Sequence, residues 1–87
     1  MSFKKITSLQ QLKDDCCDTQ EGYFIHFGAM RSSKTIEYYP EDDAFYVFND
    51  IDGTDYTCKA SELIDKGNII KAIYAGNFYN DKWNKPK

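Results

Sequence analysis

The sequence predicts an α+β domain in which a four-stranded antiparallel meander follows one N-terminal helix and precedes two short C-terminal helices, in the order α-β-β-β-β-α-α. Four segments dense in aromatic and β-branched residues lie between residues 23 and 59, and the connections between them are short and turn-like. Strands joined by short connections pair antiparallel, so we expect a meander rather than a parallel sheet.

The size of the chain favours a single folded domain over residues 1–87. Hydrophobic residues make up 41% of the sequence and aromatic residues 16%, which is too much apolar material for a disordered chain. Each large ring can bury about 150–250 Å² of surface, so the aromatic residues can supply most of a small core.

The first helix is predicted from a capping pattern. Ser8-Leu9-Gln10-Gln11 has the Ser-x-x-Gln form of a capping box, which favours a helix that begins at residue 8 or 9 and continues to Cys16 or Cys17. Leu9, Leu12 and Cys16 then lie on one helical face, at spacings of three and four residues.

The meander is bounded by turn residues. We expect its strands at residues 23–28, 34–39, 44–49 and 55–59. Residues 29–33 form a predicted loop, and residues 40–43 a turn with proline at its first central position. Asp52-Gly53 is a preferred dipeptide for a two-residue hairpin turn in which both central residues have positive φ.

Two short helices are expected after the meander. Ser61 would cap a helix over residues 62–66 that stops at Gly67, and Asn68 would cap a second over residues 69–75 that stops at Gly76. The tail that follows carries aromatic side chains, which we expect to dock on the body of the domain. These residues are Phe78, Tyr79 and Trp83.

Alternation along the strands predicts two different sheet faces. The core face, under the helices, collects Tyr23, Ile25, Phe27, Ile36, Tyr38, Phe45 and Val47. The other face collects Phe24, His26, Glu37, Tyr39, Tyr46, Phe48 and Tyr56, with His26 expected to be half-buried and hydrogen-bonded. This second face is too aromatic for a purely solvated surface, and such surfaces mark interaction sites.

Residues 50–54, Asp-Ile-Asp-Gly-Thr, resemble the first motif of the haloacid dehalogenase superfamily of phosphatases, in which the first Asp is the nucleophile and the second the general acid and base. That motif follows a parallel strand and needs a later acidic pair for magnesium, and neither is expected here. An EF-hand register also fails, because Phe48 and Lys59 would occupy its first and last ligand positions. We therefore interpret the segment as a turn and predict no catalytic residue, metal or cofactor.

The predicted loop Arg31-Ser32-Ser33-Lys34 has the residue types of a phosphate cradle but lacks the glycines of a P-loop. In a meander this loop lies at the same end of the sheet as residues 50–55, so we expect Arg31 and Lys34 near Asp50, Asp52 and Asp55. A binding role for these loop residues remains open beside a structural one.

Charge and cysteine content narrow the function classes. The net charge is −3, and no basic residue but seven acidic ones lie between Lys34 and Lys59, which does not suit direct binding of nucleic acid. Three cysteines, of which Cys16 and Cys17 are adjacent, and one histidine make a zinc site or a disulfide framework improbable. No signal peptide or membrane span is expected, so the predicted compartment is the cytoplasm.

The segments "MRSSKTIEYYPEDDAFYVFNDIDGT" and "SELIDKGNIIKAIYAGNFY" resemble a set of short bacterial and phage-associated proteins of unknown function. The resemblance implies a cytoplasmic protein without known catalytic residues, of a size at which phage proteins often inhibit a host protein. We therefore expect a non-enzymatic protein-interaction module, an inhibitor or accessory factor for a basic or nucleic-acid-binding host protein. A homodimer and a binder of small phosphorylated ligands or nucleotides are the alternatives.

Overall fold

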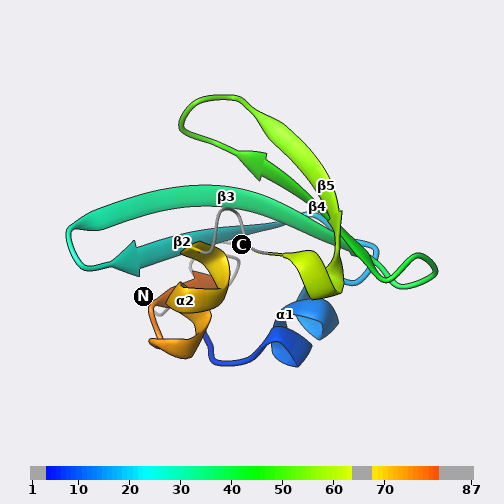
Figure 1. Ribbon diagram of the computed structural model, residues 1–87, viewed down its shortest axis with the longest axis horizontal. Coiled ribbons are helices and arrows are strands. Elements are labelled where there is room, and N and C mark those ends of the chain that lie inside the picture. The colour runs from blue at the N-terminus through cyan, green and yellow to red at the C-terminus, as the bar shows by residue number, and fades with distance from the viewer. Residues whose placement is uncertain (1–3, 64–67, 81–87) are drawn as a thin grey trace, which may run out of the picture.

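The computed structural model describes residues 4–63 and 68–80. It is an α+β structure with one six-stranded antiparallel sheet in the order β1-β6-β2-β3-β4-β5 and two helices on the same side of that sheet (Figure 1). The predicted class is confirmed, whereas the predicted number of four strands is wrong. None of the helices in this described part is long and apolar enough to cross a membrane.

The observed helices and strands agree closely with the predicted ones in the middle of the chain and less closely at its ends. They are β1 (Lys4–Ile6), α1 (Leu9–Asp15), β2 (Glu21–Phe27), β3 (Met30–Tyr39), β4 (Ala44–Asn49), β5 (Asp55–Lys59), the 3-10 helix η1 (Ala60–Glu62), α2 (Asn68–Tyr74) and β6 (Phe78–Asn80). The predicted strands 44–49 and 55–59 coincide with β4 and β5.

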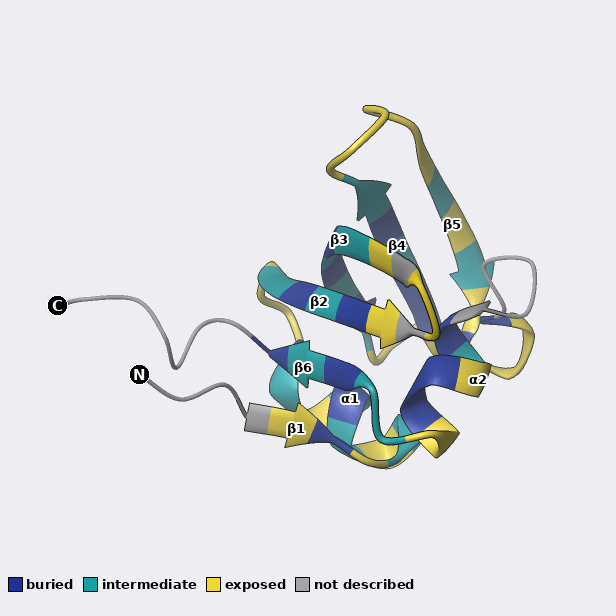
Figure 2. Cartoon of the chain, turned by 90° about the vertical axis from the view of Figure 1, so that its left-hand side faces the viewer, coloured by how far each residue is buried: buried dark blue, intermediate teal, exposed yellow. Residues whose placement is uncertain are grey.

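The C-terminal strand β6 lies between β1 and β2, as Figure 2 shows. It pairs with both in antiparallel register, so that Phe78 has Ile6 on one side and Ile25 on the other. The expected docking of Phe78 and Tyr79 on the domain is therefore confirmed in the form of a strand that the sequence did not predict. Trp83 lies outside the described residues.

Helix α1 begins where its capping residues predict. The Ser8 hydroxyl accepts a hydrogen bond from the Gln11 backbone N–H at 3.1 Å. The Gln11 side chain reaches back to the Thr7 N–H at 3.2 Å, one residue earlier than in a standard capping box. Leu12 and Cys16 on its inner face are buried.

Helix α2 ends in a Schellman motif. Gly76 has a φ of 73°, its N–H donates to the Ile73 carbonyl at 2.9 Å, and the Asn77 N–H donates to the Ala72 carbonyl at 2.8 Å. The predicted stop at Gly76 is thus confirmed. The helix predicted over residues 62–66 lies mostly outside the described residues, and Ser61 lies inside η1 rather than at a helix cap.

The predicted loop at 29–33 is wrong. Strand β3 begins at Met30, and Phe27 pairs with Met30, which leaves only Gly28 and Ala29 in the turn. Gly28 has a φ of 62°, and glycine with positive φ at the first central position is what a two-residue type II′ turn requires. Arg31, Ser32 and Ser33 are therefore strand residues.

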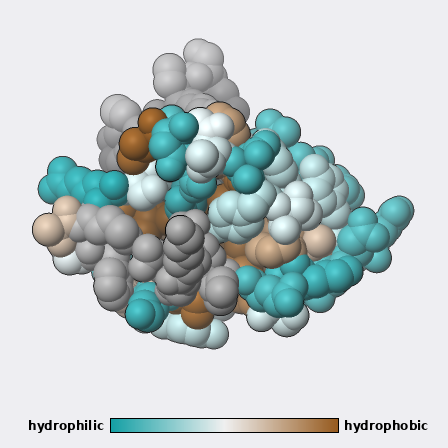
Figure 3. Space-filling view, turned by 45° about the horizontal axis from the view of Figure 1, so that its top comes forward, coloured by the Kyte–Doolittle hydropathy of each residue, from teal (hydrophilic) through white to brown (hydrophobic). Residues whose placement is uncertain are grey.

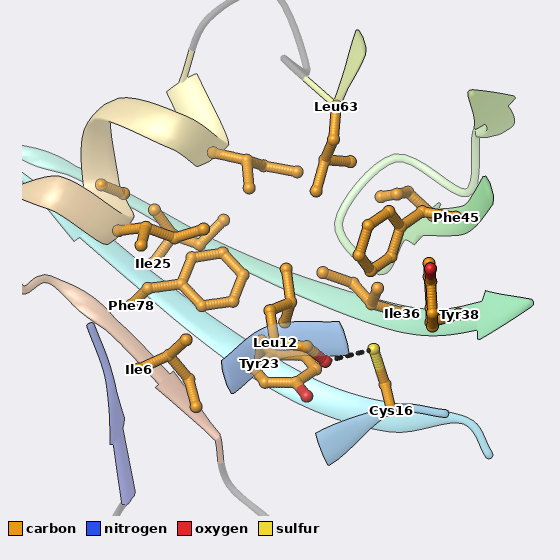
Figure 4. Close-up of a cluster of buried hydrophobic side chains, with 14 of the residues drawn as sticks. Ile6, Leu12, Cys16, Tyr23, Ile25, Ile36, Tyr38, Phe45, Leu63 and Phe78 are labelled. Carbon is orange, nitrogen blue, oxygen red and sulfur yellow. Dashed lines mark hydrogen bonds between the residues drawn. The ribbon is translucent and has the colours of Figure 1, made fainter. Parts of the chain in front are cut away.

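The core lies between the sheet and the helices and contains side chains from both helices and from every strand except β5, whose Tyr56 and Cys58 are partly buried against it (Figures 2 and 4). The Tyr23 ring contacts Phe78 at 5.1 Å and the Tyr38 ring contacts Phe45 at 4.8 Å between centroids. The predicted core-face residues are buried, apart from Phe27, whose side chain is outside the described set. The confirmed ones are Tyr23, Ile25, Ile36, Tyr38, Phe45 and Val47.

A polar cluster joins α1 to the turn between β3 and β4. The Lys13 ammonium forms an ion pair with the Asp43 carboxylate at 3.3 Å and lies over the Tyr38 ring. The Tyr38 hydroxyl donates to the same carboxylate. The bonds from Tyr38 and Lys13 hold the pKa of Asp43 below its usual value, and the bond to Asp43 raises the pKa of Tyr38 to about 12.

Phe78→Ala should lower the free energy of unfolding by about 3–5 kcal/mol, because Phe78 is fully buried and its removal leaves a cavity between β1, β2 and α2. Urea unfolding followed by circular dichroism measures this. Tyr74→Ala, at a side chain that is 74% exposed, is the control and should change stability by no more than about 0.5 kcal/mol. Equal losses in the two variants would contradict the structure of β6.

Asp43→Asn should reduce the melting temperature at pH 7, and by a smaller amount at pH 3. A carboxyl whose pKa is lowered on folding stabilises the protein above its unfolded pKa of about 3.9, and this stabilisation is lost as the pH falls through the folded value. Asn tolerates the positive φ of 46° at this position, so the comparison isolates the charge. Thermal unfolding between pH 3 and pH 7 tests the prediction, and parallel curves for the two proteins would refute it.

Candidate functional site

The surface of the sheet that faces away from α1 and α2, here called the outer face, is the candidate site (Figure 1). No described helix packs on it. Strand register assigns its side chains, since directly paired residues point to the same face. They are Lys5, Phe24, His26, Arg31, Ser33, Thr35, Glu37, Tyr39, Tyr46, Phe48, Asp55, Thr57, Lys59 and Tyr79.

Two aromatic groups lie on the outer face. Phe24 and His26 of β2 neighbour Tyr79 of β6, with the His26 and Tyr79 rings 5.6 Å apart in an edge contact. Across the sheet, a second group on β3 and β4 consists of Tyr39, Tyr46 and Phe48. All except His26 are half-buried. Figure 3 shows weakly polar and hydrophobic surface on one side of the molecule, bordered by hydrophilic groups.

A carboxylate with two hydroxyl donors lies at the end of β4, beside the outer face of β3. Ser33 donates to one oxygen of Asp50 at 2.8 Å, and Thr35 donates to the other at 3.0 Å. The Asp50 backbone N–H also donates to the Ser33 carbonyl at 3.0 Å, which extends the pairing of β3 and β4 by one residue. Asp50 is therefore fixed beside β3 and acts as a hydrogen-bond acceptor.

The tyrosine hydroxyls on β3 and β4 are also engaged with carboxylates. Tyr46 donates to Asp55 at 3.0 Å, and this hydrogen bond raises the pKa of Tyr46. Tyr39 donates to Glu37 at 3.2 Å, and partial burial together with that bond raises the pKa of Tyr39. Both phenols therefore remain neutral, and this half of the outer face presents aromatic rings beside negative charge.

Residues 50–54 form the turn between β4 and β5, as predicted, but the turn is longer than two residues. The Asn49 N–H donates to the Thr54 carbonyl at 2.7 Å and the Gly53 N–H to the Asn49 carbonyl at 2.8 Å. Gly53 has a φ of 75°, whereas Asp52 is not in the positive-φ region that the predicted two-residue turn needs. Two hydrogen bonds from Thr54 lower the pKa of Asp52.

The residues proposed as a phosphate cradle do not converge. Because β3 is extended there, Arg31 and Ser33 lie on the outer face, whereas Ser32 and Lys34 lie on the core face. Lys34 is only 6% exposed and donates to the Asn49 side chain. Of the two cations expected near the acids, Lys34 approaches Asp52, since its charge adds to the Thr54 hydrogen bonds that lower the pKa of Asp52. The contact of this segment with Asp50 comes instead from Ser33.

Two further site predictions are corrected by the structure. Tyr56 pairs with buried Val47 and packs against the core, so it does not belong to the outer face. His26 is exposed rather than half-buried, and the contact found for its ring is with Tyr79. Tyr79 and Lys5 were not predicted as outer-face residues, because β1 and β6 were not recognised as strands. The alternation Phe78-Tyr79 was the available signal for β6.

The three cysteines are free and differ in environment. Cys16 is buried, its thiol donates to the Leu12 carbonyl at 2.9 Å (Figure 4), and burial raises its pKa to about 12. Cys58 is partly buried and Cys17 is exposed. Among the described residues, no group of three or more His, Cys, Asp or Glu side chains could hold a metal ion.

Comparisons of the chain with protein-family models, with curated proteins and with solved structures found no match. The resemblance to short bacterial and phage-associated proteins therefore rests on the sequence segments alone.

Iodoacetamide at pH 8 should modify Cys17 first and leave Cys16 unmodified in the folded protein, because only a thiolate reacts and the Cys16 thiol is buried with a raised pKa. Peptide mass spectrometry over time separates the two sites. Denaturant should make both react. Modification of Cys16 as fast as Cys17 in native buffer would contradict the described packing of α1.

Proposed function

We propose that the protein is a non-enzymatic interaction module of the cytoplasm that binds another protein through the outer face of its sheet, as an inhibitor or accessory factor. The observation that supports this most is the combination on one sheet face of half-buried aromatic side chains with carboxylates. Tyr39, Tyr46 and Phe48 lie beside Glu37 and Asp55 there, and no described helix covers them.

The chemistry of this face favours a basic protein surface as its partner. Tyrosine is enriched in protein interfaces, where its ring supplies contact area and its hydroxyl finds a polar partner. The carboxylates that accept from Tyr39 and Tyr46 keep further lone pairs for a cationic side chain of the partner. Arg side chains could both stack on the rings and pair with these carboxylates.

Single-stranded nucleic acid is a less suitable ligand for the same rings. Aromatic sheet faces that stack bases combine them with basic residues along the strand path. Here Asp50 is bound to Ser33 of the outer face and Asp55 to Tyr46, so phosphate groups would approach carboxylates. The outer-face cations are Lys5 of β1, Arg31 near the start of β3 and Lys59 at the end of β5, so they lie on three separate strands rather than along one path.

The alternative, a site for a phosphorylated ligand at residues 31–34, is not supported by the geometry of these residues. A phosphate site needs several donors that converge on one point. In this strand the Arg31 and Lys34 side chains point to opposite faces of the sheet, and the Ser33 hydroxyl already donates to Asp50.

The double variant Tyr39→Ala/Tyr46→Ala should lose partner binding and remain folded, because it removes two rings from a surface outside the core. Tagged protein is incubated with nuclease-treated bacterial lysate and recovered. Mass spectrometry of the bound fraction then identifies a partner present in near-stoichiometric amount. Titration of that purified partner should then show a dissociation constant raised by at least about tenfold.

Tyr74→Ala provides a matched control, since it removes an exposed tyrosine from α2 rather than from the outer face. It should bind as the unchanged protein does. Circular dichroism and melting curves establish that all variants are folded. Undiminished binding by a folded Tyr39→Ala/Tyr46→Ala protein would overturn the proposal.

A further inference from the structure

Strand β5 is the last strand of the sheet and has a paired neighbour, β4, on one side only among the described residues. We propose that this edge pairs with β5 of a second copy of the chain, antiparallel and about a twofold axis at Thr57. The proposal concerns the edge of the sheet and does not require the partner proposed for its outer face.

The backbone hydrogen bonds show which groups of β5 point outward. The Thr54 carbonyl accepts from the Asn49 N–H of β4, and the Ala60 N–H donates to the Asp43 carbonyl at the other end of the same pair. Along a strand the hydrogen-bonding direction alternates with every residue. Tyr56 and Cys58 therefore bond toward β4, whereas the N–H and C=O groups of Asp55, Thr57 and Lys59 point away from it.

These three outward residues form a self-complementary set. In antiparallel pairing about Thr57, Thr57 faces Thr57 of the second copy, and Asp55 faces its Lys59. Each of these is a hydrogen-bonded pair, so all the outward N–H and C=O groups of the three residues find partners. Opposite charges and threonine pairs are both favourable directly across a strand pair.

The side chains of the same residues are available for this pairing. Asp55, Thr57 and Lys59 are exposed and lie together on the outer face. The Asp55 carboxylate accepts from Tyr46 through one oxygen, and the Lys59 ammonium donates to the Asp42 carbonyl at 3.1 Å. A carboxylate has about four acceptor sites and an ammonium three donors, so neither is saturated by its present contact.

The charges of Asp55 and Lys59 also favour antiparallel pairing of two β5 strands over parallel pairing. A lysine on an edge strand normally opposes pairing with other strands. Parallel pairing in register would place Lys59 against Lys59 and Asp55 against Asp55, and like charges directly opposite are unfavourable. The antiparallel twofold arrangement is the one that matches the two charges, and twofold dimers of this isologous kind are the commonest protein assemblies.

Sedimentation equilibrium of the complete chain in reducing buffer, up to the concentrations used for nuclear magnetic resonance, tests the proposal. We expect a monomer–dimer equilibrium. Thr57→Pro should raise its dissociation constant by at least about tenfold, because proline removes an outward N–H but no bond to β4, a position at which edge strands tolerate it. Thr57→Val keeps the N–H and should stay within about threefold of the unchanged protein.

A charge exchange tests the register independently, should Thr57→Pro fail to fold. Asp55→Lys should weaken the dimer by at least about tenfold, and Asp55→Lys/Lys59→Asp should restore it to within about threefold, since the pair is then reversed but still complementary. A chain that stays monomeric at every concentration overturns the proposal. So does a dimer that a folded Thr57→Pro leaves intact, or one that is not restored by the double exchange.

Discussion

The insertion of β6 between β1 and β2 is the constraint on which the rest of the fold depends. It brings the two ends of the described chain together, since Ile6, Phe78 and Ile25 lie side by side across three strands. It also fixes α2, because the Schellman turn at Gly76 leads directly into β6 and returns the chain antiparallel to β2. Without β6 the edge of β2 would be open and Phe78 would leave the core, so the helices would lose much of the surface on which they pack.

This arrangement gives the sheet two unequal faces. Both helices cover one face, and three aromatic residues there, Tyr23, Phe45 and Phe78, are fully buried. On the outer face, neighbouring side chains of the sheet provide partial burial, and hydroxyl–carboxylate hydrogen bonds hold Tyr39, Tyr46, Ser33 and Thr35 in place. Rings and acceptors that are already ordered lose less conformational entropy when a partner binds, which is why such a face suits recognition better than a loop of the same composition.

The parts of the structure that depend on local signals could be predicted from the sequence. Strands β4 and β5, the Ser8 cap and the stop at Gly76 each follow from residues within a few positions. β1 and β6 have three residues each, and their pairing joins opposite ends of the chain, so the short alternation Phe78-Tyr79 was too little to indicate that pairing. The segment 31–34 is polar and favoured a loop, yet pairing with β2 overrides that preference. The core-face position of Tyr56 could have been predicted, because antiparallel pairing places it beside Val47.

A dimer formed through the β5 edge would also change the surface that the outer face presents to a partner. A twofold axis perpendicular to the sheet leaves the outer faces of both copies on the same side, as one continuous surface. A partner with two matching sites, or a repeated one, would then meet both faces, and the second contact would form at a high effective concentration. Asp55 takes part in both surfaces, since it accepts from Tyr46 and faces Lys59 of the second copy. Occupation of either surface therefore changes the electrostatic environment of the other, and binding of a cationic partner at Tyr46 competes with edge pairing for the same carboxylate.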